Sequence, residues 1–124
     1  MYFLSNLLME FIKSYDLNNN DLFLDLSMDM NEYLKDKDYY LKEYYILNKY
    51  QILARKKDLN TNDLKEIRSI KVNSIEKGDY LTVCTCLILL KEYDEYNIYF
   101  NKLDEDNKII FKSWAIYNML GGEV

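Results

Sequence analysis

Proline and histidine are absent from this sequence of 124 residues, and glycine occurs only three times. Because proline is the strongest helix breaker, its absence permits helices throughout the chain. The missing histidine removes the side chain that most often transfers protons near neutral pH. The sequence also has no glycine-rich phosphate loop and no nucleophile elbow. These absences predict a protein that is not an enzyme and that needs no cofactor, with no catalytic and no metal site.

Cysteine is nearly absent as well, since the chain has only Cys84 and Cys86. On a helix, residues two apart point about 200° from each other, which suits neither a disulfide nor a shared metal. We interpret both as reduced core residues, which indicates a cytoplasmic protein. No apolar run reaches the roughly 18 residues of a membrane span. The first ten residues lack the basic region and cleavage site of a signal peptide, so we expect a soluble protein.

The charge of the chain is negative overall but unevenly distributed. The net charge of −5 argues against direct binding of nucleic acid, because phosphate affinity comes mainly from lysine and arginine. Residues 49–77, called here the basic island, carry eight bases and four acids, whereas both flanking parts are acidic. Acids interleave with these bases, which favours a salt-bridged helix face over a phosphate site. The candidate electrostatic contacts in the island are Arg55, Lys56 and Lys57.

Apolar residues recur with the helical period along the whole sequence, and no segment has an obvious partner strand. The apolar fraction of 49% is sufficient for a globular core. Asn60 to Asp63 offer several N-caps, Gly78 offers a helix stop, and the run from Tyr80 to Leu90 is apolar on nearly all sides. We therefore predict an all-α fold of about seven helices in antiparallel hairpins. With their caps, the segments are 3–15, 21–35, 38–57, 60–77, 80–90, 94–103 and 104–120.

One stretch resembles a known repeat. Residues 90–103, LKEYDEYNIYFNKL, resemble the turn and second helix of a tetratricopeptide repeat (TPR), with Tyr93, Phe100 and Leu103 at packing positions of that family. A second, overlapping similarity begins at KGDY, residues 77–80. The sequence departs from the family at Lys91, where glycine is expected in the turn, and at Tyr96, where a small alanine is expected. No proline closes the repeat.

This resemblance implies a fold and a role. It implies a single helical domain, residues 1–124, in which acidic helices at 1–57 precede TPR-like hairpins at 58–120. TPR domains bind protein segments, so we expect the helix from Tyr80 to line a concave surface. One hairpin cannot bury its own apolar face, which also predicts self-association at the last helix, as a homodimer. The candidate partner-binding residues are Leu81, Thr85, Ile88, Leu89, Trp114 and Tyr117.

An alternative of another class is a small acidic inhibitor, encoded by a phage or another mobile element. It would occupy the nucleic-acid-binding site of a target protein through rows of carboxylates. Asp21, Asp25 and Asp29 form such a row, at the spacing of successive helical turns. The same row is typical of a solvated helix face, and we favour that interpretation over a cation site or an acid–base pair.

Overall fold

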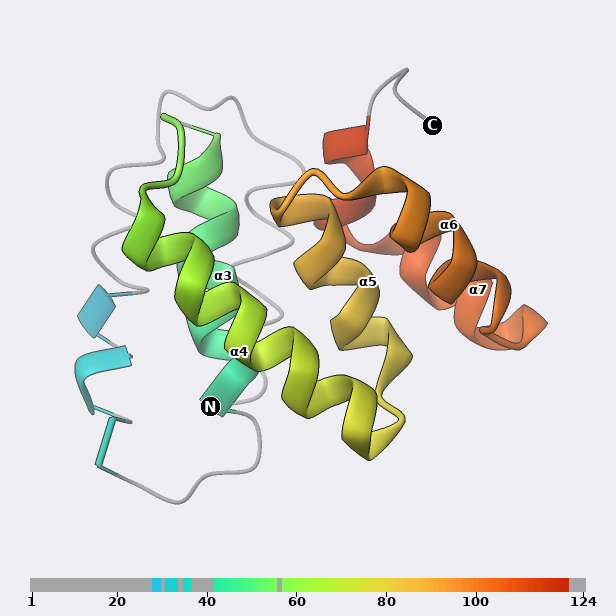
Figure 1. Ribbon diagram of the computed structural model, residues 1–124, viewed down its shortest axis with the longest axis horizontal. Helices are drawn as coiled ribbons and strands as arrows, with labels where there is room; N and C mark the ends of the chain where they lie inside the picture. The colour runs from blue at the N-terminus through green and yellow to red at the C-terminus, as the bar shows by residue number, and fades with distance from the viewer. Residues whose placement is uncertain (1–27, 30, 34, 37–41, 56, 121–124) are drawn as a thin grey trace. The chain divides into compact units, whose positions relative to one another are not determined.

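The computed structural model describes residues 28–29, 31–33, 35–36, 42–55 and 57–120 (Figure 1). The chain forms two compact units, residues 1–59 and 60–124. All regular structure in the described ranges is helical, which confirms the all-α prediction for them. The predicted helix at 3–15 lies outside the described residues. The described helices are α3 (Lys42–Ala54), α4 (Thr61–Lys77), α5 (Tyr80–Leu89), α6 (Tyr93–Asn101), α7 (Glu105–Ser113) and the 3₁₀ helix η2 (Ala115–Leu120).

In the first unit, short helical pieces occur at 28–29 and 31–33, inside the predicted segment 21–35. Helix α3 buries Leu47, Tyr50 and Ile52. It ends at Ala54, three residues before the end of the predicted segment 38–57. The Arg55 guanidinium donates a hydrogen bond of 2.8 Å to the carbonyl of Gln51. This bond satisfies one of the carbonyls that a helix end leaves without an intrahelical partner.

Helix α4 begins and ends where its capping residues predict. The side chain of Asn60 accepts a hydrogen bond from the Asp63 amide, and the Asp63 carboxylate accepts one from the Asn60 amide, so the two form a capping box. At the other end, Gly78 takes a φ of 74°, the left-handed conformation that glycine adopts at least cost. Its amide donates to the carbonyl of Ile75, which closes the last turn.

Helix α5 is the centre of the second unit. It packs against α4, α6 and η2, and Figure 1 shows it between α4 and α6. Asp79 caps it by accepting hydrogen bonds from the amide and the hydroxyl of Thr82. Every residue from Thr82 to Leu89 is buried, as the continuous apolar run predicts. Although α5 is the most apolar of these helices, it spans ten residues, and none of the described helices is long and apolar enough to cross a membrane.

The turn between α5 and α6 places the start of α6 earlier than predicted. The amide of Lys91 donates to the carbonyl of Ile88, and the amide of Glu92 donates to that of Leu87, which is a Schellman-type helix end. Because this closure leads directly into Tyr93, α6 begins there. Asp94 therefore lies in the first turn of α6, and the prediction that it caps the helix is wrong.

The predicted helix at 104–120 is two elements in the structure. Asp104 caps α7 by accepting a 2.7 Å hydrogen bond from the Asn107 amide. Trp114 then takes an extended backbone, with ψ at 147°, before η2 begins. In a continuous helix, Tyr117 would point about 240° away from Phe111. The break at Trp114 lets the Tyr117 ring meet the edge of Phe111, with their centroids 6.2 Å apart.

Lys91 provides a test of the turn, because its φ of 59° is left-handed without the freedom of glycine. That conformation costs a non-glycine residue roughly 1 kcal/mol or more, so Lys91→Gly should raise the free energy of unfolding by about 0.5–1 kcal/mol. Gly78→Ala is the matched control: a Cβ there meets no atom within 4 Å, so only the strained φ should act, with a loss of about 1 kcal/mol. Urea denaturation followed by circular dichroism measures both. A destabilising Lys91→Gly change would contradict the described turn.

Candidate functional site

The residues predicted to line a concave surface on α5 are mostly interior. Thr85, Ile88 and Leu89 are 3–4% exposed, and Leu81 is half-buried. The Thr85 hydroxyl is satisfied within the helix, where it donates to the carbonyl of Leu81 at 3.1 Å. Of these four candidates, only Leu81 reaches a surface recess. The set does not form an open binding face.

The two aromatic candidates at the end of the chain meet at Phe111. Trp114 and Tyr117 are half-buried, and their ring centroids lie 5.6 and 6.2 Å from that of Phe111. Phe111 itself is fully buried and also contacts Tyr96 and Phe100 of α6. Trp114 and Tyr117 therefore help to hold η2 and α7 together around one ring.

The candidate electrostatic contacts are only partly within the described residues. Asp21, Asp25 and Lys56 lie outside them, whereas Asp29 and Lys57 are exposed. Arg55 is half-buried, and burial lowers its pKa to about 10. It therefore remains charged at neutral pH. Of the acidic row on which the inhibitor alternative rests, only Asp29 lies within the described residues.

Two bases of the basic island form ion pairs with the α5–α6 turn and the start of α6. Arg68 hydrogen-bonds to Glu92, and the Lys71 ammonium lies 3.8 Å from Glu92 and 3.6 Å from Glu95. Burial alone would raise the pKa of Glu92, but the hydrogen bond from Arg68 and the charge of Lys71 outweigh it and hold that pKa below its ordinary value. Arg68 and Lys71 are therefore salt-bridged, but to acids of the α5–α6 turn and of α6 rather than to the acids interleaved with them. These ion pairs hold α4 to the turn.

Cys84 is fully buried, and burial raises the pKa of its thiol to about 12. Since the thiolate is the nucleophile, a thiol with this pKa is not activated at neutral pH. Cys86 is fully buried as well, and neither cysteine is in a disulfide. The prediction that both lie in the core is confirmed.

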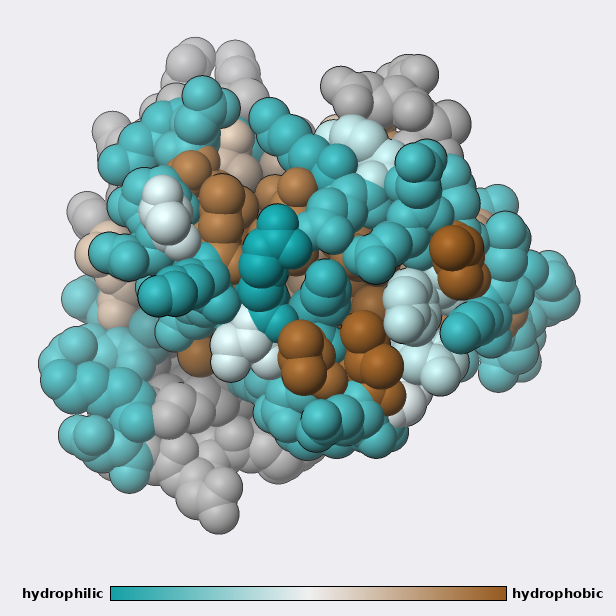
Figure 2. All heavy atoms as spheres, viewed as in Figure 1, coloured by the Kyte–Doolittle hydropathy of each residue, from teal (hydrophilic) through white to brown (hydrophobic). Residues whose placement is uncertain are grey.

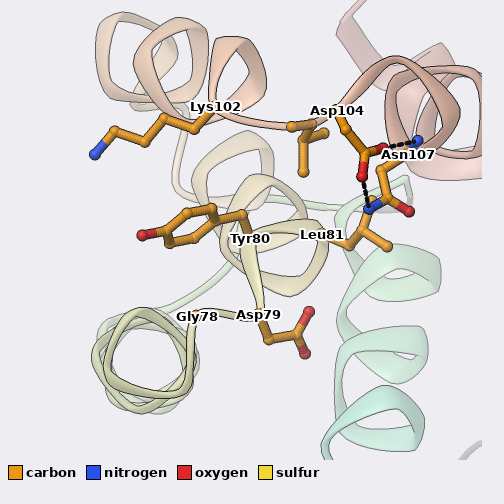
Figure 3. A pocket seen from close by; sticks show the side chains of 8 residues that line it. Gly78, Asp79, Tyr80, Leu81, Lys102, Asp104 and Asn107 are labelled. Atoms are coloured by element: carbon orange, nitrogen blue, oxygen red, sulfur yellow. Dashed lines mark hydrogen bonds between the residues drawn. The ribbon is translucent and has the colours of Figure 1, made fainter.

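A recess of about 250 Å³ lies where the α4–α5 and α6–α7 turns come together (Figure 3). Its polar groups do not converge on one point, since Tyr80 and Lys102 extend to one side of the view while Asp104 and Asn107 lie on the other. Asp104 is already engaged as a cap, as is Asp79. The recess therefore offers no set of free polar groups that would orient a small ligand. Its lining residues are Gly78, Asp79, Tyr80, Leu81, Lys102, Leu103, Asp104 and Asn107.

Large apolar side chains are exposed on α6 and α7. Ile98 of α6 is 56% exposed, and Ile109 and Ile110 of α7 are 68% and 44% exposed. Ile98 is two residues from buried Tyr96, and Ile109 is two residues from buried Phe111, so each isoleucine points about 200° away from the buried side of its helix. Figure 2 shows apolar atoms that interrupt the polar surface over α4 and α6.

This apolar surface was not predicted from the sequence. Ile109 and Ile110 fit the general apolar pattern of the last segment, and Ile98 lies within the stretch that resembles a TPR helix. A signal was nevertheless present, because neighbouring residues on a helix differ by about 100° and Phe111 already takes the buried direction. The same argument applies to Ile98, which is out of phase with Tyr96 and Phe100.

Comparison of the chain with models of known protein families, with curated proteins and with solved structures finds no match.

The ion pairs at Glu92 predict a pH-dependent contribution to stability. A carboxylate whose pKa is lowered by folding stabilises the protein above its unfolded pKa, and this contribution is lost as the pH falls through the folded pKa. Because the partners are partly exposed, Glu92→Gln should cost about 0.5–1 kcal/mol at pH 7, and less at pH 3. Urea denaturation at both pH values measures it, with Glu76→Gln on the exposed side of α4 as the control. A cost that is equal at both pH values would contradict the assignment.

Proposed function

We propose that this chain is a non-catalytic helical module that binds another protein through the outer face of its α6–α7 hairpin. The outer face is defined here as the exposed surface of α6 and α7, which carries Ile98, Ile109 and Ile110. The exposure of these three isoleucines, 44–68%, is the observation that carries the proposal.

The distribution of exposed apolar side chains supports this choice of surface. Six large apolar residues are exposed among those that the structure describes, and three of them lie on this one hairpin. Burial of an aliphatic side chain of this size contributes about 1.5–3 kcal/mol. Single exposed apolar residues are ordinary, but several on one short hairpin surrounded by charges fit an interface with an apolar centre and a polar rim.

A TPR-like architecture is part of the proposal, and two positions bear on it. Lys91 has a left-handed φ at the position where that family has a turn glycine, which supports a TPR-like turn. Tyr96 stands where the family has a small residue, and here it is buried against Phe100 and Phe111. Since Thr85 and Ile88 are buried too, we place the binding surface on the outer face rather than in a groove along α5.

A photo-crosslinking amino acid at position 109 tests the proposal. The full chain with p-benzoylphenylalanine in place of Ile109 is irradiated in the cells that make the protein, and adducts are identified by mass spectrometry. A second variant carries the same group at Asn73, which is exposed on α4. We expect discrete protein adducts from position 109 and none from position 73. Equal adducts from both positions, or none from either, would show that the outer face is not a binding surface.

A further inference from the structure

We infer that the α6 part of the outer face recognises an acidic segment of a partner protein, in which a carboxylate side chain lies one helical turn from an apolar one. The inference rests on the proposed function and gives the chemical class of the partner. It comes from a lysine and two tyrosines that meet at the end of α6. These are Lys102, Tyr99 and Tyr80, called here the Lys102 cluster.

The Lys102 cluster is held together by contacts between the two rings and the ammonium group. The centroids of the Tyr80 and Tyr99 rings lie 5.4 Å apart. The Lys102 ammonium lies 4.8 Å from the centroid of Tyr99 and 5.7 Å from that of Tyr80. Because the two rings already hold the lysine in place, less side-chain entropy is lost when a partner pairs with it.

The cluster has donors that the chain itself does not use. Lys102 is exposed and has no carboxylate within ion-pair distance among the residues that the structure describes. The hydroxyls of Tyr80 and Tyr99 have no hydrogen-bond partner within the same part of the chain. A carboxylate accepts hydrogen bonds at both of its oxygens, and it pairs most strongly with a charged donor. The cluster therefore provides a cation, with hydroxyl donors beside it, for an acidic group.

The two acids that line the neighbouring recess form no ion pair with Lys102. Asp79 and Asp104 both accept hydrogen bonds as helix caps. Figure 3 shows their carboxylates on the side of the recess away from the Lys102 ammonium and the Tyr80 hydroxyl. The carboxylate of the partner is therefore expected outside the recess, on the surface where the side chains of Lys102 and Tyr80 end.

The acids of α6 leave the charge of Lys102 unopposed. Glu95 is paired with Lys71 at 3.6 Å. Asp94 precedes Lys102 by eight residues, or about 12 Å along the helix axis, which exceeds the Debye length of about 8 Å at physiological salt. A positive charge is thus available at the end of α6, although the net charge of the chain is −5. Charge complementarity at this end of α6 favours a partner that carries an acid.

Ile98 supplies the apolar part of the same contact. It precedes Lys102 by four residues, which places both side chains on one side of α6, about 6 Å apart along the axis. Ile98 is 56% exposed, and Lys102 is exposed as well. A helical segment whose apolar and acidic residues are also one turn apart matches this spacing. Its apolar residue would exclude water from the neighbouring ion pair, as apolar contacts do around the centre of an interface.

Two fluorescent helical peptides test the inference on the full chain. Both are alanine-based; one has a glutamate four residues before and after a central leucine, and the other has glutamines there. Since α6 has only nine residues, we expect a dissociation constant of about 0.1–1 mM for the glutamate peptide, measured by fluorescence anisotropy. The glutamine peptide should bind about three- to tenfold more weakly, because it lacks the charge that pairs with Lys102.

Three variants locate the contact. In Lys102→Gln the two peptides should bind equally, within about twofold, because the partner of the glutamate is removed. Tyr80→Phe keeps the ring and removes only the hydroxyl, and it should weaken binding of the glutamate peptide by about two- to threefold. Lys65→Gln is the matched control, since Lys65 is exposed on α4, and it should retain the full difference between the peptides. Circular dichroism confirms that each variant remains folded.

Equal binding of the two peptides to wild type would overturn the inference, and so would a difference that persists in Lys102→Gln. Absence of binding by both peptides at up to about 1 mM would overturn it as well. The proposed function fails separately, because it rests on adducts from position 109 of α7. If position 109 gives adducts while neither peptide binds, the outer face remains a binding surface, and only the acidic chemistry of its partner is wrong.

Discussion

The burial of α5 is the interaction on which the second unit depends. Eight consecutive residues, Thr82–Leu89, are inside, and both threonines among them have hydrogen-bond partners. A helix that is apolar on all sides must be surrounded, and α4, α6 and η2 pack around it. The cap at Asp79 and the left-handed Lys91 fix where this helix begins and ends. The ion pairs of Glu92 hold α4 to the turn between α5 and α6.

The enclosure of α5 determines which residues are accessible. Thr85, Ile88 and Leu89 contribute to the core, so they stabilise the fold and form no open surface. The large Tyr96 and Phe111 rings fill the space between α6 and α7 and direct Ile98 and Ile109 outward. The same packing that completes the core thus creates an exposed face, and the proposed binding activity follows from that geometry.

Local signals in the sequence predicted much of the helical structure. The exposed apolar surface of α6 and α7, in contrast, depends on contacts between helices. The capping box at Asn60, the stop at Gly78, the cap at Asp104 and the buried α5 are all visible as residue types at fixed spacing. The break at Trp114 is not, because the contact that it permits, of Tyr117 with Phe111, joins two separate elements. The resemblance predicted a groove at Thr85, Ile88 and Leu89, whereas the burial of α5 on several sides leaves no open groove there. The exposed isoleucines fit the apolar periodicity as well, and only the contact of Tyr96 with Phe111 decides which of the neighbouring apolar residues face inward.

Thiol labelling of the folded protein tests the enclosure of α5 most directly. Cys84 and Cys86 are the only thiols in the chain and are both fully buried on α5. Under native conditions, a reagent such as 5,5′-dithiobis-(2-nitrobenzoate) should modify them only through unfolding, with a rate that follows the unfolding equilibrium as urea is added. Rapid modification of the folded chain in the absence of urea would contradict the account, because it would place α5 at an open surface and return the binding site to that helix.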